Sequence, residues 1–73
     1  MIQIQLYHHR SRKAFERWCK KMGIEFKFDG YGSWYYDPFY FISDSKGFEG
    51  CPVDVWDENT NLIHQKPESR RIV

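Results

Sequence analysis

Residues 31–41 read YGSWYYDPFYF, and seven of these eleven residues are aromatic. In a β-strand successive side chains point to opposite faces, and here the odd and the even positions are both largely apolar. A chain of 73 residues builds one core. One face of the strand therefore packs into that core, and the other is either covered by another element or exposed. Pro38 favours the exposed alternative, because proline is found at edges, strand starts or bulges.

The N-terminal part of the chain predicts a strand, a helix and a second strand. Residues 1–7 (MIQIQLY) and 24–28 (IEFKF) alternate apolar and polar side chains, as half-buried strands do. Between them, residues 12–22 gather their apolar side chains on one arc of a helix. We expect Ser11 to be its N-cap and Gly23 to end it. Because the helix carries the chain back, the two strands should run parallel in a β-α-β unit.

The C-terminal part predicts three more strands. The aromatic strand, residues 34–43, comes first, and residues 53–56 and 62–65 then flank a polar turn in a hairpin pattern. The expected fold is α+β, in the order β-α-β-β-β-β, with one amphipathic helix on one face of a mixed sheet of four or five strands. We expect a single domain over residues 1–66 and a loose tail over residues 67–73. The predicted core consists of Ile4, Leu6, Phe15, Trp18, Met22, Phe26 and Phe28.

Residues 4–28, IQLYHHRSRKAFERWCKKMGIEFKF, resemble the opening β-α-β unit of thioredoxin-like proteins, glutaredoxins especially. The shared features are a strand that ends in an apolar-Tyr step, a helix with basic and apolar residues, and a following G-I-E-F. The Cys-x-x-Cys of that family is absent, because HHRS stands between the strand and the helix. The resemblance therefore implies local geometry alone, and no redox residue is carried over.

Charge is distributed unevenly along the chain. Residues 8–27 carry seven Lys or Arg against two Glu, whereas residues 28–60 carry one Lys against seven acids. A basic pole and an acidic pole can steer association with a charged partner. The basic side chains of the helix could also follow a phosphate backbone, although the acidic second half would repel a polyanion. This basic face consists of Arg12, Lys13, Arg17, Lys20 and Lys21.

Histidines are the candidates for chemistry. His8, His9 and Arg10 follow the first strand, and with His64 they could cleave a phosphodiester by acid-base catalysis. Paired histidines carry little specificity, and a polar turn is the simpler interpretation. The histidines and cysteines also match no compact zinc spacing. We therefore expect no catalytic residue, no metal and no cofactor.

Cysteine usage and hydropathy indicate the compartment. Cys19 falls on the apolar arc of the predicted helix, so we expect a buried free thiol and no bridge to Cys51. Met1 begins directly with a strand pattern and not with a signal peptide. No apolar run approaches the roughly 20 residues that span a membrane. A cytoplasmic protein without a membrane partner is expected.

These observations predict a small non-enzymatic protein-binding module. It could be an inhibitor, an antitoxin or a phage-type accessory protein that acts on a host enzyme or a nucleic-acid-handling complex. Tyrosine and tryptophan are enriched at binding hot spots. The predicted partner-binding residues are Tyr31, Trp34, Tyr35, Tyr36 and Tyr40. Three alternatives stay open: a nucleic-acid-binding protein that uses the basic face and the sheet aromatics, a small His-dependent nuclease, and a homodimer formed through the aromatic patch.

Overall fold

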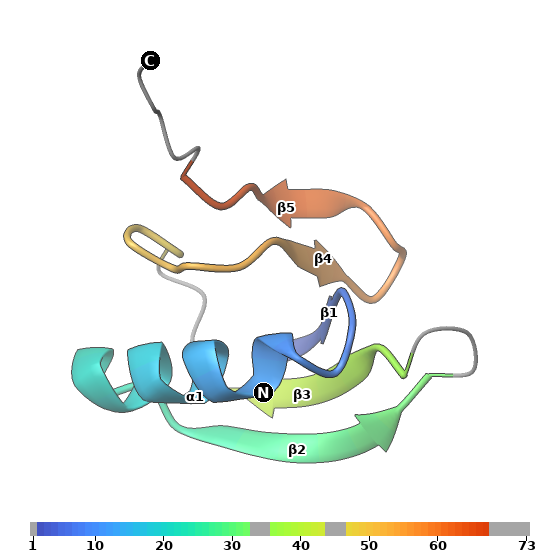
Figure 1. Ribbon diagram of the computed structural model, residues 1–73, viewed down its shortest axis with the longest axis horizontal. Helices are drawn as coiled ribbons and strands as arrows, with labels where there is room; N and C mark the ends of the chain where they lie inside the picture. The colour runs from blue at the N-terminus through green and yellow to red at the C-terminus, as the bar shows by residue number, and fades with distance from the viewer. Residues whose placement is uncertain (1, 33–35, 44–46, 68–73) are drawn as a thin grey trace.

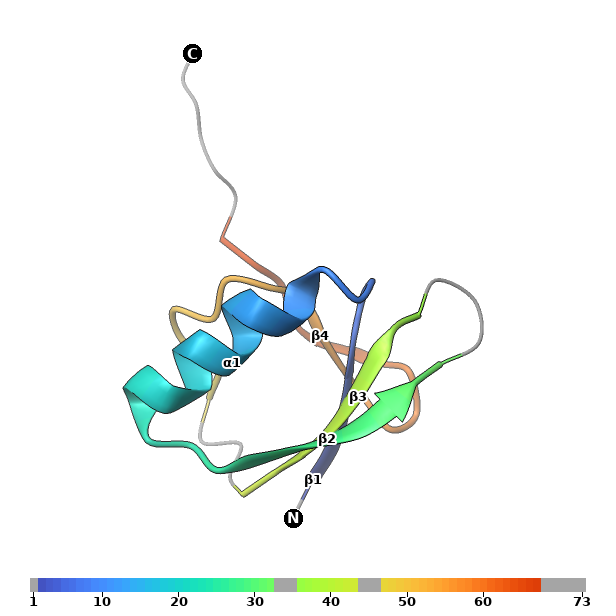
Figure 2. The ribbon, with the colours of Figure 1, turned by 60° about the horizontal axis from the view of Figure 1, so that its bottom comes forward.

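The computed structural model of the protein describes residues 2–32, 36–43 and 47–67 and forms one helix on a five-stranded sheet. The strand order is β2-β3-β1-β4-β5, and α1 lies on one side of the sheet (Figures 1 and 2). The predicted α+β class with a single helix on one face is confirmed. The elements are β1 (Ile2–Leu6), α1 (Ser11–Met22), β2 (Phe26–Tyr31), β3 (Pro38–Ile42), β4 (Val55–Asp57) and β5 (Leu62–His64).

All four strand pairings are antiparallel, so the prediction of a mixed sheet is wrong in this detail. β1 and β2 do run in the same direction, because both are antiparallel to β3. However, β3 lies between them: Tyr40 is paired with Ile4 on one side and with Phe28 on the other. The connection through α1 therefore places β2 one strand position away from β1. β3, which follows β2 in the chain, occupies the position between them.

β3 is an interior strand, although Pro38 favoured an edge position. Pro38 is the first residue of β3, a position where proline is tolerated, and it is paired with Tyr31 of β2. The side chains of Pro38, Tyr40 and Ile42 are buried, and those of Phe39 and Phe41 are only partly buried. The even positions therefore face the core, and the odd positions face the other side of the sheet.

The core lies between the sheet and α1. Phe15, Trp18 and Cys19 are the buried residues of the helix. Met22, which the sequence placed in the core, is 52% exposed. The last turn of α1 extends beyond the strands in Figures 1 and 2, so this end of the apolar arc has no sheet beneath it. The buried apolar residues are Ile4, Leu6, Phe15, Trp18, Cys19, Tyr40, Ile42, Phe48, Cys51, Val53 and Val55, with Phe26 and Phe28 packed against them.

The loop that precedes β4 completes the core on the helix side. Phe48, Cys51 and Val53 are at most 8% exposed, although they belong to no helix or strand. The ring of Phe48 stacks on Trp18 with centroids 5.9 Å apart. This loop therefore occupies part of the helix layer, which a single short helix cannot fill. No helix in the described ranges is long and apolar enough to cross a membrane.

Candidate functional site

Five rings gather at the end of the sheet where β1 ends and β2 leads into β3. This ring cluster consists of Tyr7, His8, His9, Tyr31 and Tyr36. The imidazoles of His8 and His9 are stacked with centroids 4.4 Å apart. The ring of Tyr36 stands edge-on to those of His9 and Tyr31, at 6.1 and 6.2 Å. Tyr7, Tyr31 and Tyr36 are 54%, 47% and 63% exposed, so the cluster presents three accessible tyrosines.

The turn that carries the two histidines is fixed by hydrogen bonds. His8 has a φ of 69°, which few non-glycine residues adopt. Its N–H donates to Asp37 Oδ1 at 2.7 Å, and its Nδ1 accepts the Arg10 N–H at 3.2 Å. Ser11, the expected N-cap, is the first residue of α1, and Arg10 occupies the cap position. The Ser11 Oγ instead donates to the carbonyl of Tyr7 at 2.6 Å, which ties the end of β1 to the helix.

The side of the sheet opposite α1 carries a second group of aromatic side chains. We call this group the uncovered face; it consists of Gln3, Gln5, Phe39, Phe41 and Trp56. The pairing places Gln3 beside Phe41, and Gln5 between Phe39 and Trp56. All five are partly buried, and they alternate along their strands with core residues. Two amide side chains in the middle strand are therefore flanked by aromatic rings from β3 and β4.

A hollow joins the ring cluster to the uncovered face. It has a volume of about 140 Å³, and its lining includes Tyr7 and Asp37 together with Gln5 and Trp56. Gln5 Nε2 donates to Asp37 Oδ2 at 3.3 Å. Oxygen acceptors, an amide and two aromatic rings thus lie in one concave region. Such a mixture suits recognition of a partner surface by apolar contact and hydrogen bonds.

The predicted partner-binding residues differ in their exposure in the structure. Tyr31 and Tyr36 are exposed and in ring contact with each other. The prediction that Tyr40 is a docking residue is wrong, because its side chain is 0% exposed. Its ring packs against that of Phe15, with the two centroids 5.0 Å apart. Trp34 and Tyr35 lie outside the described residues.

Sequence reasoning missed four aromatic residues of these surfaces. Phe39 and Phe41 share the odd positions of β3, and the i, i+2 spacing was visible in the sequence. It could not indicate which face α1 would cover. Tyr7 directly follows β1 and Trp56 lies in β4, and only the pairing of β1 with β4 brings them to the same hollow.

The sequence predicted Arg12 to belong to the exposed basic face, but in the structure its side chain is engaged in contacts with other residues. Its Nε and Nη1 donate to the hydroxyls of Tyr40 and Tyr31 at 3.0 and 3.1 Å. It forms an ion pair with Glu16 at 2.9 Å. Its guanidinium carbon lies 3.6 Å from the centroid of the Phe28 ring. Arg12 therefore ties α1 to β2 and β3. The exposed members of the basic face are Lys13, Arg17, Lys20 and Lys21.

His64 is held apart from the other two histidines by its contacts. Its Nε2 is 3.1 Å from the carbonyl oxygen of Cys51, and its ring lies 5.7 Å from that of Phe48. Across the described ranges, no group of three or more His, Cys, Asp or Glu side chains could hold a metal ion. Cys19 and Cys51 are buried free thiols, as expected for Cys19. Burial raises the pKa of Cys19 to about 12 and also raises the pKa of Cys51.

Comparison with known proteins found no matching family model, no significantly similar curated protein and no significantly similar solved structure.

Proposed function

We propose that this protein is a small protein-binding module. Its docking surface is the ring cluster together with the hollow and the adjoining uncovered face. The observation that carries the proposal is the three exposed tyrosines at one end of the sheet, Tyr7, Tyr31 and Tyr36. Tyrosine buries a large apolar area and offers a hydroxyl, and it is enriched at binding hot spots. An inhibitor or accessory protein of this kind would act by occupying a surface of its partner.

The distribution of charge favours a protein over a nucleic acid at this surface. A protein that stacks single-stranded bases needs cations beside the rings to follow the phosphate backbone. Here the exposed Lys13, Arg17, Lys20 and Lys21 belong to α1, which covers the other side of the sheet from Phe39 and Phe41. At the ring cluster itself, Arg10 is exposed, whereas the charge of Arg12 is paired with Glu16. Asp37, in contrast, lines the hollow itself.

The test is affinity capture from a lysate with paired variants. The surface variant combines Tyr7→Ala with Tyr36→Asn; asparagine is chosen because Tyr36 has a φ of 56°, which asparagine tolerates better than alanine does. The matched control is Met22→Ala, which removes an equally exposed apolar side chain at the far end of α1. Each variant is first checked by circular dichroism and thermal unfolding.

We expect one protein to be retained by the wild type and by the control, with and without nuclease, and to be lost with the surface variant. Loss of two hot-spot tyrosines should weaken binding by at least about 30-fold. Retention by the surface variant would contradict the proposal. Proteins that disappear after nuclease treatment would favour nucleic-acid binding through the basic face. Sedimentation of the purified protein separates a homodimer from binding to another chain.

A further inference from the structure

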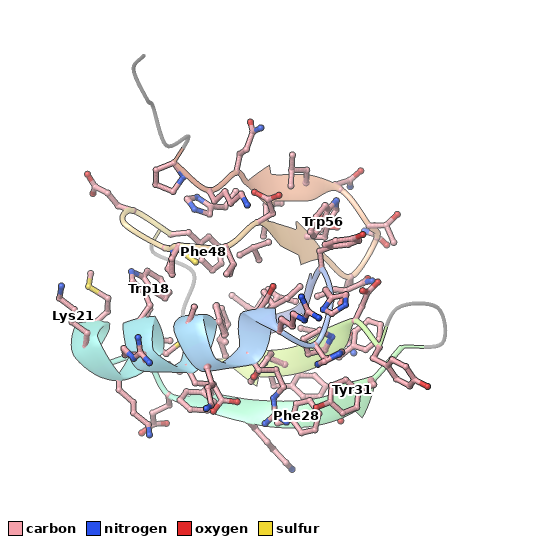
Figure 3. All side chains as sticks on the ribbon, viewed as in Figure 1. Trp18, Lys21, Phe28, Tyr31, Phe48 and Trp56 are labelled. Carbon is pink, nitrogen blue, oxygen red and sulfur yellow. The ribbon has the colours of Figure 1, made fainter. Side chains whose placement is uncertain are left out.

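A groove lies between α1 and the loop over residues 47–53, away from the proposed docking surface. It has a volume of about 260 Å³. In Figure 3, Trp18 and Lys21 leave the same side of α1, toward the loop that carries Phe48. Neither Arg17 nor Lys21 forms an ion pair with any other described residue. The lining residues, none of which is acidic, are Ala14, Arg17, Trp18, Lys21, Gly50 and Pro52.

The indole of Trp18 contributes an unpaired donor to this groove. Trp18 is 6% exposed, and its Nε1 is buried and has no hydrogen-bond acceptor among the described residues. Such buried orphan donors are rare in native proteins and call for an explanation. A Cβ atom built on Gly50 would lie 3.7 Å from this nitrogen. The unpaired N–H therefore lies at the wall of the groove that Gly50 forms.

The charge of the groove indicates the class of ligand. Arg17 and Lys21 are one helical turn apart and bring two positive charges to the same opening. A phosphate monoester carries about −1.5 to −2 charges at neutral pH and has three acceptor oxygens. Arginine, lysine and an indole N–H supply donors for those oxygens. Ala14 and Pro52 offer apolar surface to the organic part of the ester.

We propose that this groove binds the phosphate group of a monoester. Arg17 and Lys21 balance its charge, and the indole N–H of Trp18 donates a hydrogen bond to it. Gly50 has a φ of +81° and no side chain, so its backbone can be approached closely by a ligand. Because Nε1 is buried behind Gly50, this hydrogen bond requires a small shift of the Gly50 backbone that exposes the N–H to a phosphate oxygen. This site is independent of the docking surface and does not depend on the proposed function.

The Trp18 indole N–H is also a direct reporter of binding. The uniformly ¹⁵N-labelled protein is titrated with inorganic phosphate and with phenyl phosphate, while ionic strength is held constant with chloride. Two-dimensional NMR spectra follow the indole resonances, which are assigned by standard three-dimensional experiments. We expect the Trp18 indole signal to move in a saturable way, and more tightly with phenyl phosphate because of its apolar ring.

Charge-matched variants decide whether the groove is responsible. Arg17→Gln combined with Lys21→Gln should weaken binding by about tenfold or more, because both counter-ions are removed. Lys13→Gln combined with Lys20→Gln removes the same charge from exposed positions outside the groove and should leave the affinity within about twofold. All four sites are exposed or at the groove rim, so both variants should fold.

Three outcomes would overturn the proposal. The first is a Trp18 indole signal that does not move or that never saturates. The second is an equal loss of affinity in the two double variants, which would reveal general attraction by the helix. The third is tighter binding of a dialkyl phosphate or an oligonucleotide than of phenyl phosphate, which would assign the cations to a diester backbone.

Discussion

Replacing Tyr40 by Phe removes one hydroxyl from the interface between α1 and β3. Tyr40 is 0% exposed, and its hydroxyl donates to Glu16 and accepts from Arg12 Nε at 3.0 Å. The ring contacts with Phe15 and Phe28 would survive in the variant. The substitution therefore isolates the polar link between the helix and the sheet.

The expected loss in the free energy of unfolding is about 2 kcal/mol. A hydrogen bond to a charged group contributes roughly 1.5–3 kcal/mol. The side chains of Arg12 and Glu16 are 30% and 26% exposed, so water can partly replace the lost partner. For a domain of this size, about 2 kcal/mol lowers Tm by roughly 8–16 °C.

Thermal and urea unfolding followed by circular dichroism measure this loss. The matched control is Tyr36→Phe, which removes the hydroxyl of a tyrosine that is 63% exposed and should change stability by less than about 0.5 kcal/mol. A double-mutant cycle with Glu16→Gln should give a coupling energy of about 1 kcal/mol or more. Equal losses for the two Tyr→Phe variants would refute the reasoning, because Tyr40 would then have no special partner.

The same hydroxyl links stability to pH. Burial is the main cause that raises the pKa of Tyr40 above its usual range, and the hydrogen bond to Glu16 adds to it. Because the folded-state pKa is the higher one, this contribution is complete below the unfolded pKa of about 10 and is lost as the pH rises above it. Urea unfolding at about pH 7 and about pH 11 should therefore show a smaller alkaline loss for Tyr40→Phe than for the wild type.

Three further predictions concern the turn regions and the thiols. Gly23→Ala should lower the free energy of unfolding in urea by about 1 kcal/mol, since Gly23 ends α1 with a φ of 75°. Gly23→Asn should lower it less, because asparagine tolerates this conformation better than alanine does. Equal losses for the two variants would argue against backbone strain. Asp37→Ala should cost about 1–2 kcal/mol and shift the amide resonance of His8, which loses its acceptor; an unmoved resonance would contradict the contact. Cys19 and Cys51 should react with Ellman's reagent slowly at about pH 8 in the folded protein and rapidly in urea, because burial raises the pKa of both thiols; rapid reaction of the native protein would be inconsistent with their burial.

Local pattern was enough to predict most of the elements. The helix begins one residue before the predicted range and ends at Met22, and the expected strands near residues 2–6, 55–57 and 62–64 are present. β2 continues to Tyr31 through an irregular pairing, past Phe28, where the predicted strand ended. That extension depends on pairing with Pro38, which is distant in sequence. A short-range pattern does not contain such information.

The candidate sites were predicted only in part, and for a related reason. The aromatic content of residues 31–41 predicted an exposed aromatic surface, and Tyr31 and Tyr36 are indeed exposed. Tyr7 directly follows β1, and its neighbours at the hollow include Asp37, which precedes β3, and Trp56 of β4. The orphan N–H of Trp18 depends on the loop at Gly50. Neither the hollow beside Tyr7 nor the unpaired N–H of Trp18 could be found without the tertiary contacts.

The sequence alone determined that one amphipathic helix would pack on a single sheet, because the periods of 3.6 and 2 are set by backbone geometry. It also determined that one strand would be apolar on both faces. Only the tertiary structure decided which face of that strand is buried. Packing against α1 selects Tyr40 and Ile42 because the insertion of β3 between β1 and β2 turns them toward the helix. A shift of one residue would have buried Phe39 and Phe41 instead, since alternate side chains exchange faces.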